Sequence, residues 1–80
     1  PPDTYDFNPD TELNSEAILR MVQQLPAGYR TVFNLRCMEG FEYPEIATEL
    51  GITESSVRSQ YARACKQLRG LVERMLVLTL

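Results

Sequence analysis

The sequence predicts an all-α fold: a four-helix domain with a C-terminal helix-turn-helix, of the winged-helix-like class but without a wing. Three observations support this prediction. Apolar residues recur at helical spacing in four separate segments. Proline and glycine residues stand between these segments. Strand-like alternation is confined to the short stretch of residues 77–80.

The chain is expected to divide into an acidic linker at residues 1–13 and a helical domain at residues 14–80. The 80-residue length fits one small domain, and short helices with local contacts are an economical way to build a core of that size. Residues 1–12 hold three prolines and three aspartates and show no hydrophobic period. They are therefore separated from the helical part.

The first two helices are predicted on either side of a proline. The first covers residues 15–25, because the residue before Pro26 is disfavoured in a helical conformation. The second begins at Pro26 or Ala27, since proline suits a first helical turn. It should end near Glu39, with Gly40 as its C-terminal cap.

The last two helices are separated by a short turn. The third is predicted over residues 44–50. The fourth should start directly after Thr53, whose hydroxyl can cap the N-terminus. It runs to about Arg69, and the sequence leaves open whether it continues through Gly70 into residues 71–78.

A helix-turn-helix is predicted from the spacing of six residues. Two helices that cross nearly at right angles through a three-residue turn need a small residue at the crossing and a glycine in the turn. Apolar side chains must then fill the space between the helices. The residues that fit these roles are Ile46, Ala47, Leu50, Gly51, Ile52 and Val57. An ordinary helical hairpin is the alternative interpretation.

The fourth helix is predicted to have one buried face and one basic face. At about 100° per residue, Tyr61, Ala64 and Leu68 fall within about 40° of Val57, so these four form the expected buried stripe. Residues 55–80 carry five basic residues and one acidic residue, although the whole chain has a net charge of −3. A face of one sign indicates a polyanionic partner. A merely solvated basic helix is the alternative.

These considerations define a candidate DNA-binding set on the fourth helix. Small side chains let the helix backbone approach the floor of the major groove, and Arg58 and Arg63 can then reach base edges. Ser55, Ser56 and the first-turn amides can bind a phosphate. Lys66 and Arg69 lie further along the helix and suit backbone contacts. The full set is Ser55, Ser56, Arg58, Ser59, Ala62, Arg63, Lys66 and Arg69.

The chain resembles a known family in three stretches. They are Leu25-Pro26-x-x-Tyr29-Arg30-x-Val32-Phe33-x-Leu35-Arg36; Glu39-Gly40-Phe41-x-Tyr43-x-Glu45-Ile46-Ala47; and Val57-Arg58-Ser59 with Arg63-Ala64. They are similar to region 4 of bacterial sigma-70 family sigma factors of the extracytoplasmic-function (ECF) type. The resemblance covers residues 14–71.

This resemblance implies promoter recognition at the −35 element, with Arg58, Ser59, Ala62 and Arg63 at the base-proximal positions. It also implies that the upstream helices bind the flap of the RNA polymerase β subunit. Residues 1–12 would be the linker from a preceding region 2. Members of the family often have arginine at the positions of Gln60 and Cys65. The absence of these two arginines would remove two candidate phosphate contacts.

The apolar C-terminal tail, residues 71–80, has three candidate roles. It can pack on the core of this domain, bind a partner such as an anti-sigma factor, or mediate self-association. The sequence leaves these open.

Other functional classes fit the sequence less well. The output domain of a two-component or quorum-type regulator shares the helix-turn-helix, and a protein-interaction module that has lost DNA binding is a further alternative. An enzyme is not expected, because the chain has no histidine, no glycine-rich phosphate loop and no nucleophile-base pair. Cys37 and Cys65 lack metal-ligand spacing, so we expect no metal and no cofactor. We also expect a cytoplasmic protein without membrane insertion, in which both thiols are reduced.

Overall fold

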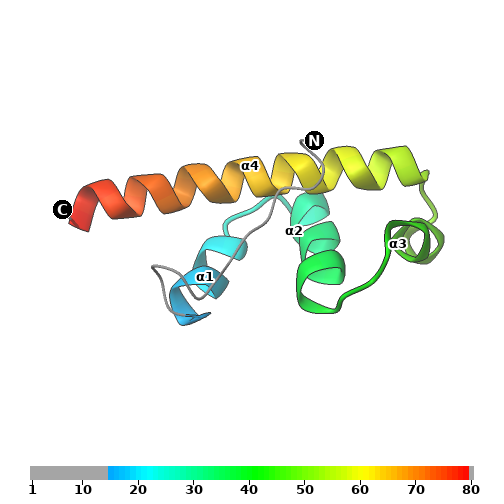
Figure 1. Cartoon of the computed structure of the whole chain (residues 1–80), viewed down its shortest axis with the longest axis horizontal. Coiled ribbons are helices and arrows are strands. Elements are labelled where there is room, and N and C mark those ends of the chain that lie inside the picture. The colour runs from blue at the N-terminus through cyan, green and yellow to red at the C-terminus, as the bar shows by residue number, and fades with distance from the viewer. Residues whose placement is uncertain (1–14, 80) are drawn as a thin grey trace.

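The computed structural model describes residues 15–79, so the predicted linker at residues 1–13 lies outside the described range. The elements follow the order α1 (Ser15–Val22), α2 (Ala27–Phe33), a π-helix η2 (Asn34–Met38), α3 (Tyr43–Leu50) and α4 (Glu54–Thr79). No strand occurs among the described residues, which confirms the all-α prediction. The long helix α4 runs the length of the molecule, with α1, α2 and α3 arranged along one side of it (Figure 1).

Helix α1 ends three residues earlier than predicted. It stops at Val22, and residues 23–25 form a tighter turn in which Leu25 N donates to Val22 O at 3.1 Å. This turn buries the Leu25 side chain directly before Pro26. Arg30 of α2 donates to the Gln23 carbonyl oxygen at 3.1 Å. The Arg30 side chain therefore links the C-terminal end of α1 to α2.

The second predicted helix is two elements rather than one. After α2 the chain forms one π-type turn, in which Glu39 N donates to Asn34 O at 2.9 Å. A π turn inserts one extra residue into the helix. Gly40 then adopts a φ of 76°, which confirms its prediction as the C-terminal cap. Phe41 N closes the cap by donating to Leu35 O at 2.9 Å.

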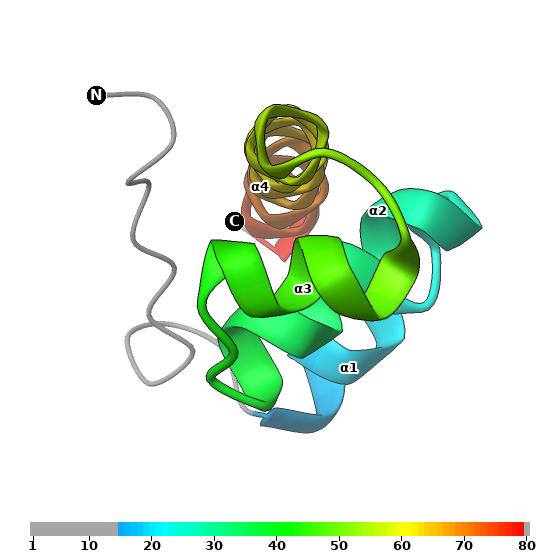
Figure 2. The same ribbon diagram turned by 90° about the vertical axis from the view of Figure 1, so that its right-hand side faces the viewer.

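The helix-turn-helix forms as the sequence predicts. Helix α3 begins at Tyr43 with Pro44 in its first turn, where a proline is harmless. Gly51 makes the turn at a φ of 67°, and Thr53 Oγ1 caps α4 by accepting from Ser56 N at 3.1 Å. Figure 2 shows α4 nearly end-on while α3 runs across the view, so the two helices cross steeply.

Helix α4 continues without a break through Gly70 to Thr79, so the longer of the two predicted helices is confirmed and residues 77–79 are helical. Its predicted buried stripe is also confirmed. Val57, Ala64 and Leu68 are fully buried and Tyr61 is 7% exposed. Ile46 of α3 is buried against them, while Ala47, Leu50 and Ile52 are partly buried beside the core. The six helix-turn-helix residues therefore occupy the predicted crossing.

Candidate nucleic-acid interface

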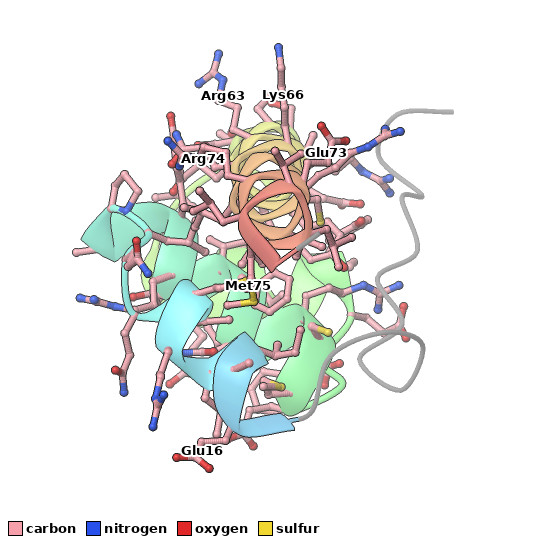
Figure 3. The ribbon with its side chains drawn as sticks, turned by 90° about the vertical axis from the view of Figure 1, so that its left-hand side faces the viewer. Glu16, Arg63, Lys66, Glu73, Arg74 and Met75 are labelled. Atoms are coloured by element: carbon pink, nitrogen blue, oxygen red, sulfur yellow. The ribbon has the colours of Figure 1, made fainter. Side chains whose placement is uncertain are left out.

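The face of α4 that points away from the other helices carries the centre of the predicted DNA-binding set. Arg63 and Lys66 project outward from this face (Figure 3). Both residues are exposed, as are Ser55 and Ser59, whereas Ala62 is partly buried. Within the described residues, neither Arg63 nor Lys66 forms an ion pair. These two cations are therefore available to a phosphate or a base edge.

Arg58 occupies a different position from Arg63. Its Nη2 lies 3.0 Å from Glu54 Oε1, and its guanidinium carbon lies 4.5 Å from the centroid of the Tyr43 ring. The side chains of Arg58 and Glu54 are both 44% exposed. Arg58 is thus held at the side of α4 that faces α3. The candidate DNA-binding set predicted for α4 includes Arg58, but neither its ion pair with Glu54 nor its contact with Tyr43 was predicted.

Ser55, Ser56 and Arg69, which also belong to the predicted set, contact other side chains of the protein to different extents. Ser56 is partly buried, and its Oγ accepts from Gln60 Nε2 at 3.1 Å. Ser55 is exposed, and its Oγ lies 3.3 Å from Thr53 Oγ1. Arg69 is exposed and pairs with Glu73 at 3.1 Å. An exposed pair of this kind contributes little to stability, so a phosphate can replace Glu73 at small cost.

Gln60 and Cys65, the two positions where family members often have arginine, both pack against the rest of the domain. Cys65 is fully buried and belongs to the hydrophobic core. Gln60 is partly buried against α2, where a Cβ added to Gly28 would lie 3.2 Å from Gln60 Oε1. Among the described residues, these two positions serve the packing of α4 on the domain.

An aromatic cluster fixes the three elements around the interface. The rings of Phe33 and Tyr61 stack at a centroid distance of 6.1 Å and an interplanar angle of 15°. Tyr43 meets Tyr61 at 6.0 Å and 59°. Offset and tilted ring pairs of this kind are favourable beyond the area they bury. The cluster links α2, α3 and α4, and so fixes the orientation of α4 relative to the other two helices.

Both cysteines are free thiols, as expected, but their environments differ. Burial raises the pKa of the Cys65 thiol, and a hydrogen bond from Tyr61 lowers it to a smaller extent. Burial likewise raises the pKa of the Tyr61 phenol above its usual range. Cys37 is exposed overall, but neighbouring protein atoms still partly desolvate its thiol and raise its pKa, while the charge of Arg36 lowers the pKa to a smaller extent.

These environments predict selective modification. In the native protein an alkylating reagent should label Cys37 first, because Cys65 is fully buried and becomes accessible only when α4 separates from the core. Mass spectrometry of the partly labelled chain measures the two sites separately. Both thiols should react at similar rates in denaturant, which is the control. Equal rates in the native protein would contradict the burial of Cys65.

These elements define a class of protein: a helix-turn-helix domain whose last helix presents a cationic face outward. The chain belongs to the sigma-70 region 4 family, since the family model described as Sigma-70, region 4 matches residues 15–68. Region 4 is a DNA-binding regulatory domain, so the chain has a role in promoter recognition or DNA binding by a sigma-like factor, in association with RNA polymerase. Comparison with curated proteins gives no match. Within residues 15–79, no helix is long and apolar enough to span a membrane.

Proposed function

We propose that this chain recognises the −35 promoter element as region 4 of an alternative, ECF-type sigma factor in the cytoplasm. The observation that carries the proposal is the outward face of α4, where Arg63 and Lys66 project away from the body of the domain (Figure 3). Ser55 and Ser59, earlier on the same helix, are also exposed. Small residues permit close approach to the groove floor. The cations then contact base edges and phosphates.

The candidate residues divide by function in this proposal. Arg58 and Arg63 contact base edges, with Ser59 and Ala62 lining the space between them. Ser55 and Ser56 receive a phosphate at the N-terminus of α4. Lys66 and Arg69 contact the DNA backbone where the helix leaves the groove. In this arrangement α3 crosses the backbone, as the first helix of such motifs does.

Promoter binding by the polymerase holoenzyme tests this function against the alternative of a protein-interaction module. Specific binding should weaken steeply as salt increases, because neutralised phosphates release counterions. A holoenzyme whose promoter selection is independent of this domain would instead support an interaction module.

The same proposal assigns the upstream helices to the flap of the RNA polymerase β subunit. Two large apolar side chains on these helices are left at the surface, since Leu19 of α1 is 48% exposed and Met38 of η2 is 49% exposed. Large apolar side chains that remain half-exposed are suited to a protein interface. They are the first positions at which to test flap binding.

Leu19→Asp and Met38→Asp should weaken capture of a β-flap fragment, because each introduces a charge into an apolar contact. A loss of about tenfold corresponds to the roughly 1.4 kcal/mol expected of a modest contact residue. Thr48→Asp is the matched control, since Thr48 is an exposed residue of α3. Wild-type chain that fails to bind the flap at high concentration would rule out this interface.

The C-terminal part of α4 offers a second surface. Its inner side packs on the core through Leu71, Val72 and Met75, which agrees with the internal-packing role considered for the tail. Val77 and Leu78 remain 71% and 85% exposed. They line an apolar groove together with Gly70, Glu73 and Arg74. In the proposed function, an anti-sigma factor is the candidate partner for this surface.

A further inference from the structure

The Tyr43 ring lies where three elements meet. It is the first residue of α3 and is 8% exposed. The guanidinium carbon of Arg36, from η2, lies 4.8 Å from the ring centroid, and that of Arg58, from α4, lies 4.5 Å away. Both distances are within the range of favourable cation–π contacts. One buried ring therefore carries two arginines from two different helices.

The two arginines differ in what else holds them. Arg36 donates to the Phe41 carbonyl oxygen at 3.1 Å and lies 3.5 Å from Glu42 Oε1. Its side chain is 32% exposed, so it is the more enclosed of the two. Arg58 is paired with Glu54, four residues earlier on α4, at 3.0 Å. Arg36 therefore belongs to the scaffold, whereas Arg58 lies beside the candidate DNA-binding face.

The Tyr43 ring is the more durable partner of Arg58. The pair with Glu54 is half-exposed, and exposed ion pairs are weakened by salt. A neighbouring DNA phosphate would compete directly for the same guanidinium. The ring does not compete with an anion, because it contacts the face of the guanidinium and the N–H donors lie at the edge.

From this geometry we infer that Tyr43 is a positioning residue that sets the base preference of Arg58. A bidentate contact with guanine requires a planar guanidinium in a fixed orientation. The Tyr43 ring supplies a flat surface that fixes the plane, and Tyr61 fixes the ring in turn at 6.0 Å. Glu54 holds the N–H edge in the absence of DNA and releases it to the base. The inference rests on the proposed function, because it concerns how one of the proposed base contacts is made.

The test is a promoter library that varies every base pair of the recognised element, bound by the polymerase holoenzyme. Arg58→Ala should remove preference at one base pair. Tyr43→Leu should keep an apolar core residue but lose the ring, and so reduce preference at the same base pair by about 2- to 5-fold, the equivalent of an exposed cation–π contact. Tyr43→Phe retains the ring and should retain the preference. In an Arg58→Ala background, Tyr43→Leu should cause no further change in preference.

Two outcomes overturn the inference. One is that Tyr43→Leu weakens all sequences alike, as a purely structural residue would. The other is that it changes preference equally in the Arg58→Ala background. Arg63→Ala in the same library tests the proposed function separately. If Arg63→Ala alters preference and Tyr43→Leu does not, the proposed function stands and the positioning role falls.

A measurement without DNA keeps the inference testable if Tyr43→Leu does not fold or if the library shows no preference. In NMR spectra of the 80-residue chain, the ring should shift the Arg58 side-chain proton resonances. Wild type and Tyr43→Phe should share this ring-current shift. Arg58 resonances at random-coil positions in the wild type would overturn the inference.

Discussion

Phe33→Ala should lower the free energy of unfolding by about 3–5 kcal/mol, the usual cost of deleting a buried aromatic side chain. Phe33 is fully buried and stacks on Tyr61 at 6.1 Å. Its loss would leave a cavity between α2 and α4, where Phe33 joins the aromatic cluster. A domain of this size is marginally stable, often near 5 kcal/mol. The variant should therefore be largely unfolded at physiological temperature.

Urea unfolding followed by circular dichroism measures this effect. Phe33→Leu keeps most of the volume and should lose on the order of 1 kcal/mol, so it gives a usable transition even if the alanine variant does not. Met38→Ala is the control, because Met38 is 49% exposed and its truncation should change stability by less than about 0.5 kcal/mol. Equal losses for Phe33→Ala and Met38→Ala would show that the packing between α2 and α4 is not the principal source of stability.

The parts of the fold that were predicted correctly depend on local chemistry. Gly51 adopts the left-handed conformation expected of a glycine in this turn, and Thr53 caps the helix that follows it. The stripe that begins at Val57 was predicted from helical periodicity alone. Each of these features depends on residues within one helix or one turn.

The features that were missed depend on contacts between elements. The π turn in residues 34–38 has no composition that distinguishes it from an α-helix. Cys65 lies outside the predicted stripe, at about 80° from Val57 on the helical projection, yet it is fully buried. The buried face is wider than the stripe because α1, α2 and α3 all contact the same side of α4 (Figure 1). A helical projection of α4 alone therefore cannot predict how wide its buried face is.

The candidate site shows the same division. Periodicity and charge placed Arg63 and Lys66 on the outward face of α4, where the structure has them. The setting of Arg58 could not be predicted in this way, since its ring partner Tyr43 belongs to the preceding helix. The i, i+4 spacing of Glu54 and Arg58 is a signal that could have indicated their ion pair. The assignment of DNA contacts remains a prediction for all eight candidate residues.

Arg63→Ala should change which promoters the holoenzyme selects. Arg63 projects from the outward face of α4 (Figure 3), and no ion pair engages it among the described residues. Losing a bidentate base contact costs about 1–3 kcal/mol, which is roughly 5- to 150-fold in relative affinity at one base pair. The other base pairs of the element should keep their preferences.

Lys66→Ala should lower affinity for all promoters without changing their order. Lys66 lies three residues after Arg63 and projects from the same side of the helix (Figure 3). In the proposed function it is nearly one turn closer to the point where α4 leaves the major groove, and its ammonium group contacts phosphate, which carries no sequence information. Its removal should reduce the magnitude of the salt-dependence slope by about one.

The comparison of Arg63→Ala with Lys66→Ala requires a control cation on α4 that lies outside the major groove of the DNA in the proposed function. Arg74 is exposed on α4, eleven residues after Arg63, and thus about 16 Å further along the helix axis at 1.5 Å per residue. Arg74→Ala should leave both the promoter order and the salt dependence nearly unchanged. The measurement is competitive binding of a promoter library by each holoenzyme at two salt concentrations. If Lys66→Ala reordered the promoters while Arg63→Ala only weakened them uniformly, the roles assigned to these two residues would have to be exchanged, because only a base contact makes the loss in affinity depend on sequence.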